Sequence, residues 1–257
     1  MVSSFFNVSG VTKRFGGLVA LDDVSFEVDK GQTYCVIGPN GSGKTTLFNI
    51  FSGLLPADRG SIVFDGVDIM GWKPHRIAQR GIGRTFQSAR LFSNMTILQN
   101  CELPQFTGSR TNLFETLLCF RGEREERMRV REIAERLLGE VGGGRLYSRR
   151  NDYPDTCSLG EQRMIELIRI LALDPEMVLM DEPTQGMNPV WISETLELID
   201  TEIKQSNKTI LFIEHKMSVV MQIADRVAVL NEGRKISEGT PEFIRDDPLV
   251  IEAYLGN

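Results

Sequence analysis

The chain has 257 residues, of which 41% are hydrophobic and 25% are charged. This composition supports one large domain with a sizeable buried core and excludes an intrinsically disordered protein. The formal net charge is −6, with 29 Lys and Arg residues against 35 Asp and Glu residues. A general nucleic-acid binder carries a basic excess, so we expect no nucleic-acid partner.

The cysteines and the hydropathy argue against a secreted or membrane-spanning chain. The four cysteines, which form no C-x-x-C pair, are Cys35, Cys101, Cys119 and Cys157. We therefore expect neither a disulfide framework nor a zinc site, and a reducing cytosol fits. No apolar stretch reaches the roughly 18 residues that span a bilayer, and the first residues lack the basic start of a signal peptide. Any link to a membrane should come through a partner.

Short β-type runs alternate with helical patterns along most of the chain, as is typical of an α/β fold. Two runs, Met177–Met180 and Thr209–Ile213, are apolar throughout, which predicts central strands of a parallel sheet covered on both faces. The expected strands are Phe5–Val8, Val24–Val28, Thr33–Ile37, Ser61–Phe64, Met177–Met180, Thr209–Ile213 and Arg226–Leu230.

A glycine-rich segment follows the third expected strand. Residues Gly38 to Thr45 fit the pattern G-x-x-x-x-G-K-[ST], and a helical pattern follows from Thr46 to Phe51. Glycines let successive N–H groups point at phosphate oxygens, and the helix adds its positive end. Lys44 can bridge the outer two phosphates of a nucleotide, and the Thr45 hydroxyl can ligate magnesium. A chance glycine-rich turn would leave this register unexplained, but kinases, GTPases and motors all share such a loop.

Strand signals vanish between residues 95 and 156. Arg124–Val141 has apolar residues at helical spacing, and the charged run Arg121–Arg131 fits the solvated start of that helix. Gly142, Gly143 and Gly144 mark a flexible break behind it. We expect residues 95–156 to form an inserted helical lobe, with residues 1–94 and 157–257 forming the nucleotide-binding α/β core of a single cassette.

Two carboxylates end the expected strand Met177–Met180. Asp181 suits a magnesium contact, and Glu182 is placed to polarise an attacking water as a general base. An Asp-Glu pair at a strand end usually just marks a turn. Downstream of a phosphate loop, the functional interpretation is favoured.

Further segments occur in the order of one family. They are Phe86-Gln87, Cys157-Ser158-Leu159-Gly160-Glu161-Gln162-Arg163, Asp181-Glu182-Pro183-Thr184 and Ile213-Glu214-His215. They resemble the glutamine loop, signature, carboxylate motif and switch histidine of ATP-binding-cassette (ABC) ATPases, and the resemblance covers essentially the whole chain. It implies an α/β fold, with a phosphate-loop ATPase core, a mixed sheet and the inserted helical lobe. The activity it implies is ATP hydrolysis coupled to transmembrane transport.

The resemblance also implies roles for individual residues. The cofactors it implies are ATP and Mg²⁺. The expected ATP contacts are Phe15, Gly38, Pro39, Asn40, Gly41, Ser42, Gly43, Lys44, Thr45 and Thr46. The expected magnesium contacts are Thr45, Gln87 and Asp181, and the expected catalytic residues are Glu182, His215 and Gln87. Ser158, Gly160 and Glu161 are expected to contact the ATP held by a second subunit.

Three of these residues have plainer interpretations. Ser158 opens an apolar-patterned helix and could be an ordinary N-cap. A lone histidine is more often structural, although its position after Ile213-Glu214 favours the switch role for His215. Phe15 could be an ordinary core phenylalanine instead of the aromatic that the family stacks on adenine.

The chain departs from the family pattern at three positions. Leu159 replaces a signature glycine and adds a side chain where backbone normally approaches phosphate, so we expect a shifted loop or weaker ATP affinity in the dimer. Cys157 replaces a leucine, a small apolar exchange. Asn188 stands where many relatives carry aspartate, so crosstalk between two nucleotide sites could differ.

Several tracts resemble the ATPase subunits of branched-chain amino-acid importers. They are residues 12–21, 83–87, 186–189 and 213–217, and the tail with Gly239-Thr240-Pro241-Glu242, Asp247-Pro248 and Ala253-Tyr254-Leu255-Gly256. Importers of urea or short amides share this tail, so they remain an alternative. The implied partners are a second ATPase subunit (in a homodimer or heterodimer), membrane permease subunits and, indirectly, a solute-binding protein. The implied location is the cytoplasmic face of the cell membrane, reached through the permease.

Rival functions leave parts of the sequence unexplained. A DNA-maintenance ATPase needs long coiled-coil heptads, for which residues 95–156 are too few. Ribosome-associated cassette proteins fuse two cassettes, and this chain has one phosphate loop. A small-molecule kinase would not need residues 158–163 or His215. Apolar residues in the tract Ser88–Met95, directly after Gln87, predict a groove that accepts a short permease helix, with burial against the helical lobe as the alternative.

Overall fold

The structure is a computed structural model that describes residues 4–85, 91–103 and 120–255. The strands are β1 (Phe6–Phe15), β2 (Leu18–Val28), β3 (Thr33–Ile37), β4 (Arg59–Phe64), β5 (Val67–Asp68), β6 (Ile82–Arg84), β7 (Met177–Asp181), β8 (Thr209–Ile213), β9 (Arg226–Asn231) and β10 (Arg234–Gly239). The α-helices are α1 (Lys44–Phe51), α2 (Pro74–Gln79), α3 (Ile97–Glu102), α4 (Phe120–Glu140), α5 (Arg145–Ser148), α6 (Leu159–Leu171), α7 (Pro189–Ser206), α8 (Met217–Ile223), α9 (Pro241–Asp246) and α10 (Pro248–Leu255).

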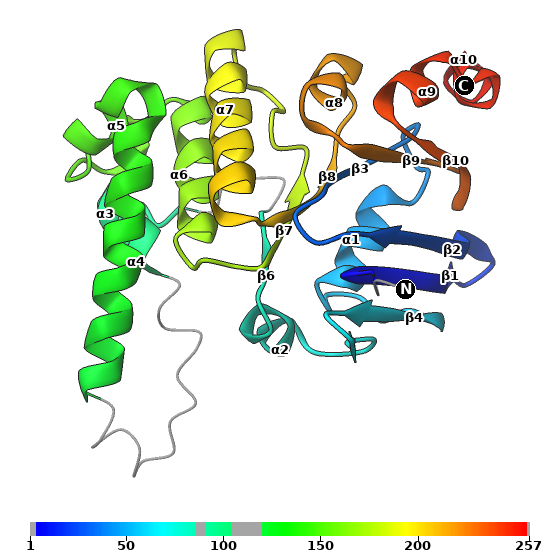
Figure 1. Ribbon diagram of the computed structural model, residues 1–257, viewed down its shortest axis with the longest axis horizontal. Coiled ribbons are helices and arrows are strands. Elements are labelled where there is room, and N and C mark those ends of the chain that lie inside the picture. Colours follow the sequence, from blue (N-terminus) through cyan, green and yellow to red (C-terminus); the bar gives the residue numbers. More distant parts are fainter. Residues whose placement is uncertain (1–3, 86–90, 104–119, 256–257) are drawn as a thin grey trace.

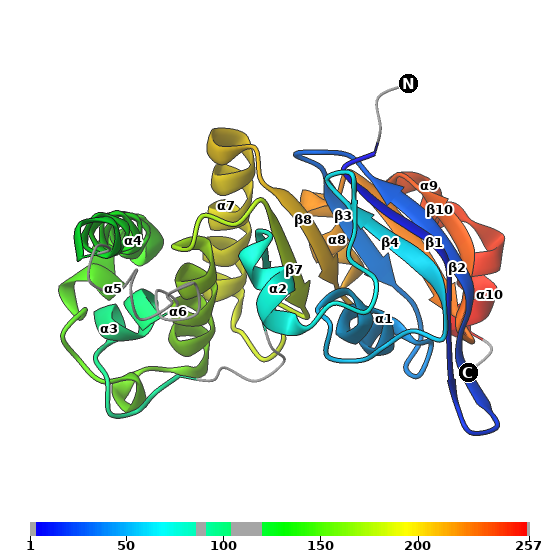
Figure 2. The same cartoon turned by 90° about the horizontal axis from the view of Figure 1, so that it is seen from below.

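The described strands form two sheets. The larger sheet has the order β10-β9-β3-β8-β7-β6, in which β10 is antiparallel to β9 and the other neighbours are parallel. The smaller sheet has the order β2-β1-β4-β5 and is antiparallel. Helix α1 lies beside the small sheet, and α6, α7 and α4 lie on the other side of β7 (Figure 1, Figure 2). The prediction of an α/β fold with a mixed sheet is confirmed.

The central strands are buried along their whole length. Every residue of β3, β7 and β8 is buried, as the unbroken apolar runs predicted. One apolar cluster fills the space between the two sheets and α1, where the Phe6 ring meets Phe51 edge-on and the Phe26 ring stacks on Tyr34 with centroids 5.0 Å apart.

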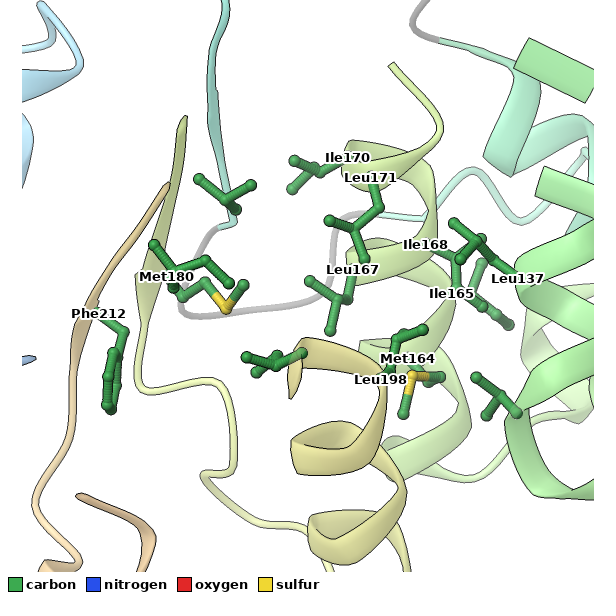
Figure 3. Packing of buried hydrophobic residues seen from close by; sticks show 14 of the residues in the cluster. Leu137, Met164, Ile165, Leu167, Ile168, Ile170, Leu171, Met180, Leu198 and Phe212 are labelled. Carbon is green, nitrogen blue, oxygen red and sulfur yellow. The ribbon is translucent and has the colours of Figure 1, made fainter. Parts of the chain in front are cut away.

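Helix α6 lies between the parallel sheet and helices α3 and α4. Its apolar residues face both ways, toward Met180 and Phe212 of the sheet and toward Leu137 of α4 (Figure 3). Residues of β3 and residues of α3 and α4 consequently belong to one continuous apolar cluster. Helices α3 and α4, which lie in the range predicted as the lobe, therefore share an apolar core with α6.

Helix α4 covers the expected helix Arg124–Val141 except for its last residue, because α4 ends at Glu140. Gly142, Gly143 and Gly144 follow with φ angles of 58°, 60° and 81°. Three successive left-handed residues are favourable only for glycine, so the helix is interrupted at these residues.

All seven expected strands are present, but the sequence analysis missed β5, β6 and β10. The first two have only two and three residues, and no residue of β10 is fully buried, so none gives an apolar run. Strand β1 runs on to Phe15, past a register shift between Val8 and Val11 where Gly10 has φ 62°. No helix among the described residues has the length and apolar character to cross a bilayer.

Candidate nucleotide-hydrolysis site

The glycine-rich loop joins β3 to α1 and is shaped by close backbone contacts. A Cβ atom on Gly38 would lie 2.0 Å from the Leu230 carbonyl oxygen, and one on Gly43 would lie 2.6 Å from that of Ala20. Both glycines have positive φ angles, 150° and 102°. Only glycine fits these two positions, and the loop is therefore held in one curled shape between β9 and β2.

Lys44 folds back over this loop. Its Nζ atom donates hydrogen bonds of 2.8 Å to each of the carbonyl oxygens of Gly38 and Pro39. Burial lowers the pKa of the Lys44 ammonium below its usual value. Two carbonyl dipoles hold the ammonium inside the loop, where an anionic phosphate would meet it without a change of fold. Thr45, one residue on, is exposed.

Three chain segments with polar side chains meet at one edge of the parallel sheet. Strands β3, β8 and β7 are neighbours, and their carboxyl ends carry the phosphate loop, the Glu214-His215 segment and the Asp181-Glu182 pair. Carboxyl ends of neighbouring parallel strands are where ligands bind in open α/β sheets. The phosphate loop, the Asp181-Glu182 pair and His215, which are distant in the sequence, thus lie at the same edge of the sheet.

Asp181 is the last residue of β7 and is 2% exposed. Its Oδ2 atom lies 3.5 Å from Nη2 of Arg84, a β6 residue that also donates hydrogen bonds to the Phe48 carbonyl and the Ser52 hydroxyl. Burial raises the pKa of the Asp181 carboxyl, and Arg84 opposes this shift. Oδ1 has no hydrogen-bond partner among the described residues.

An unpartnered carboxylate oxygen at this edge fits a ligand of a divalent cation. Magnesium prefers carboxylates, hydroxyls and nucleotide phosphates as ligands. Within residues 4–85, 91–103 and 120–255, no group of three or more His, Cys, Asp and Glu side chains could hold a metal ion alone. A magnesium site here would therefore be completed by nucleotide phosphates, with Asp181 and Thr45 as protein ligands.

Glu182 and His215 come into direct contact. His215 Nε2 lies 2.8 Å from Glu182 Oε1. Glu182 has a φ of 52°, and its backbone N–H donates to the Ile213 carbonyl at 3.1 Å. A left-handed conformation is unfavourable for glutamate, and residues strained in this way cluster at functional sites. It orients the carboxylate toward the histidine instead of continuing the strand.

The signature segment forms the start of α6. Ser158 is the N-cap, its hydroxyl accepting from Glu161 N, while Glu161 Oε2 accepts from Ser158 N at 2.7 Å. The Glu161 carboxylate also receives Arg149 Nη1 at 3.0 Å. Ser158 and Leu159 are exposed, whereas Gly160 is buried against the Trp191 side chain. The N-cap interpretation of Ser158 is correct for the single chain, and Glu161 holds the cap within its own subunit.

The remaining expected residues lie in different surroundings. Phe15 ends β1 with 46% of its surface exposed and has Lys13 Nζ 5.5 Å from its ring centroid, so it is not a core residue. Gln87 lies outside the described residues. Asn188 Oδ1 accepts from Trp191 N at 3.0 Å and thereby begins α7.

Sequence reasoning missed three residues that shape this region. Arg84 precedes the glutamine loop, Glu214 lies between Ile213 and His215, and Trp191 follows the Asn188 segment. Arg84 could have been suspected, because it lies in Gly83-Arg84-Thr85, directly before the glutamine loop. A basic residue there could pair with a carboxylate at a strand end. No sequence signal pointed to the contact between Trp191 and Gly160.

Comparisons with known proteins agree with this geometry. Residues 21–185 match the family model described as ABC transporter, and residues 234–257 match the one described as branched-chain amino acid ATP-binding cassette transporter. The chain is 41% identical over 260 positions to the high-affinity branched-chain amino acid transport ATP-binding protein BraF of Pseudomonas aeruginosa, covering 100% of this chain and 99% of the relative. It is 38% identical over 256 positions to the corresponding protein LivG of Escherichia coli, with the same coverage.

Solved structures show the same fold. A crystal structure of the ADP conformation of an ATP-binding cassette of an ABC transporter superimposes with a TM-score of 0.84 at 31% identity, covering 100% of both chains. A dimeric cassette bound to ADP and phosphate superimposes with a TM-score of 0.73 at 23% identity, over 92% of this chain and 98% of that one.

Proposed function

The chain belongs to the ATP-binding subunits of ABC transporters, and from that premise we propose that it hydrolyses ATP to drive the uptake of branched-chain amino acids. Relatives that match along the whole chain are branched-chain amino acid transport ATP-binding proteins, and the last residues match the model of that transporter family; both support this substrate class. The observation that carries the proposal is the meeting of the phosphate loop, Asp181-Glu182 and His215 at one edge of the sheet.

Each side chain at this edge has a distinct task in hydrolysis. The loop N–H groups and Lys44 would bind the β- and γ-phosphates, and Phe15 would stack on adenine. Mg²⁺, held by Thr45, Asp181 and Gln87, would neutralise charge on the phosphates. Glu182 would accept the proton of the attacking water, and His215 would hold the Glu182 carboxylate in place and contact the γ-phosphate.

A second subunit would complete the site. Ser158 is exposed at the N-terminus of α6, where its hydroxyl accepts from Glu161 N of the same helix. Such a helix end binds anions, so Ser158 would act on the nucleotide of the partner. Gly160, which is buried against Trp191, and Glu161, which is bound to Ser158 and Arg149, would contribute by holding this helix end in place. The partner would be a second copy or a related ATPase.

The permease would dock beside the glutamine loop, at the cytoplasmic face of the membrane. Phe92 is 52% exposed, and its backbone is fixed by Asn100, which is fully buried. Phe92 N donates to Asn100 Oδ1 at 2.8 Å, while Asn100 Nδ2 donates to the carbonyls of Phe92, Met95 and Thr96 at 3.1, 3.2 and 3.0 Å. A rigid loop that presents an exposed aromatic ring suits an apolar anchor for a short permease helix.

Reconstitution would test the proposal. The chain is co-expressed with its permease subunits and reconstituted into lipid vesicles. ATP is placed on the side of the membrane that the chain occupies, and the solute-binding protein on the other side. Uptake of labelled leucine, isoleucine and valine should depend on ATP and stop in a Lys44→Ala variant. Uptake of urea or short amides without leucine uptake would assign the chain to the alternative importers. Failure to co-purify with any permease would contradict a transport function.

A further inference from the structure

Glu214 is a buried carboxylate between the two loops that carry Glu182 and His215. It follows β8 directly and is 3% exposed. Strands β7 and β8 pair in register up to Asp181 and Ile213, and Glu214 is the first residue beyond that ladder. The two loops that continue from these strands therefore begin where regular sheet pairing ends.

Beyond the last paired residues of β7 and β8, the Glu214 carboxylate links the two loops through its own hydrogen bonds. Its Oε1 atom accepts hydrogen bonds from the backbone N–H of Thr184, at 3.3 Å, and from the Thr184 hydroxyl. Its Oε2 atom accepts from the backbone N–H groups of His215 and Lys216, at 2.9 and 3.2 Å. One oxygen thus holds the loop after β7, and the other holds the loop after β8.

Burying a carboxylate is costly, and hydrogen bonds to the charged form offset the cost. Thr184 is fully buried and lies two residues after Glu182. The His215 side chain is 36% exposed, so packing alone does not fix its ring. Its contact with Glu182 at 2.8 Å needs both backbones at a defined separation.

We propose that Glu214 is a positioning residue for ATP hydrolysis, which sets the separation of Glu182 and His215 by holding Thr184 and the His215 backbone at the same time. This role rests on the proposed function, since it concerns the orientation of the general base. It predicts that Glu214 acts through His215 and that nucleotide binding by the phosphate loop does not depend on it.

Glu214→Gln replaces one acceptor oxygen by an amide that faces another donor. Glu202→Gln is the matched control, because Glu202 is 1% exposed and accepts from Arg136 on α4, away from the strand-end edge. Thr184→Val removes only the hydroxyl donor, and Thr184→Ser restores it. Steady-state hydrolysis, ATP affinity and thermal unfolding are measured for each variant and for Glu214→Gln combined with His215→Ala.

Glu214→Gln should lower kcat by about 10- to 100-fold, as expected when a reacting group is misplaced, with ATP affinity and unfolding temperature close to those of the Glu202→Gln control. Thr184→Val should lower kcat in the same direction, and Thr184→Ser should recover most of it. In the His215→Ala background, Glu214→Gln should cost less than about two-fold, because residues that act through one another are not additive.

Nuclear magnetic resonance gives a readout apart from activity. The chain has two histidines, His75 and His215, and His75 is exposed on α2. At fixed pH, the His215 ring signals should shift in Glu214→Gln and in Thr184→Val, while those of His75 stay in place.

Three outcomes would each overturn the positioning role. The first is an unchanged kcat in Glu214→Gln, and the second is a fold-loss of kcat in the His215→Ala background as large as in the unmodified chain. The third is His215 signals that do not shift. If Glu214→Gln does not fold, the same three readouts apply to Thr184→Val. An unmodified chain that hydrolyses no ATP would instead overturn the proposed function itself, so the two failures are distinguishable.

Discussion

The indole ring of Trp191 occupies the space that a Cβ atom on Gly160 would need, because that atom would lie 2.5 Å from Trp191 Cδ1. The glycine of the signature segment is therefore required by packing within the chain. This contact joins the start of α6 to the start of α7, directly after the Asn188 segment.

Gly160→Ala should destabilise the chain by about 1–3 kcal/mol, the range for overpacking a filled interior. Gly139→Ala is the control, since Gly139 lies in α4 with nothing within 4 Å of the added atom. It should raise stability by up to about 1 kcal/mol through helix propensity. Urea unfolding of both variants measures the difference, and equal stabilities would contradict the packing role of Trp191.

Glu182→Gln should lower ATP hydrolysis by about 100-fold or more. The amide keeps the shape and the contact with His215 but cannot accept the proton of the attacking water. ATP binding should survive, and the trapped nucleotide should drive a stable dimer on size exclusion. Turnover at the unmodified rate would show that another group acts as the base.

Ser158→Arg should spare ATP binding and abolish both dimerisation and hydrolysis. The residue is exposed at the N-terminus of α6, so the added guanidinium leaves the core intact and blocks the approach of a partner. A mixed dimer of Ser158→Arg with Lys44→Ala subunits should retain at most one intact composite site. Ser148→Arg, at another exposed serine, should behave as the unmodified chain; normal hydrolysis by Ser158→Arg would refute the composite site.

The sequence was informative where chemistry depends on local order. The phosphate loop, Asp181, Glu182 and His215 each follow an apolar strand, so their meeting at one sheet edge could be predicted. Contacts between distant segments could not. The pairing of Glu214 with Thr184 joins two loops 30 residues apart, and no periodicity or motif encodes the distance between them.

Half-exposed positions explain the other omissions. β10 has three charged residues and one large apolar residue, Ile236, and none of its residues is fully buried, so its pairing with β9 leaves no apolar run. Phe15 is exposed because the β1–β2 hairpin extends beyond the covered part of the sheet. The sequence does not reveal this extension, because register shifts interrupt the alternating pattern of the ten-residue strand β1.

Three cysteines should resist thiol reagents in the folded chain. Burial raises the pKa of the Cys101 thiol to about 12 and also raises the pKa values of Cys35 and Cys157. The thiolate is the reactive form, so labelling at pH 8 in a Cys119→Ser variant should require unfolding. Rapid labelling without denaturant would contradict the burial of these side chains.

The same shifts predict a loss of stability in alkali. A thiol whose folded pKa is raised keeps its proton while the unfolded chain releases it above about pH 8.5. The free energy of unfolding should therefore fall as pH rises from that value toward about 12, to which burial raises the pKa of Cys101. Cys101→Ala should flatten this fall, which denaturant titrations across the range would measure.

Phe92→Asp should separate ATP binding from transport. The loop is held through the backbone of Phe92 by Asn100, so the exposed ring can be replaced without loss of fold. A carboxylate in place of the ring would leave a charge unpaired in an apolar interface, and truncating such an anchor costs about 2 kcal/mol or more of binding. Recovery with the permease should fall, and leucine uptake should stop.

The matched control for this prediction is Phe243→Asp. Phe243 is 57% exposed on α9, close to the 52% of Phe92, so the substitution has the same chemistry and similar exposure at a remote surface. Both variants should bind ATP and unfold at similar temperatures, but only Phe92→Asp should lose the permease. Persistence of both co-purification and uptake in Phe92→Asp would place the coupling surface elsewhere on the chain. Equal loss in both variants would show that exposed aromatic rings act through general solubility and not through a defined docking site.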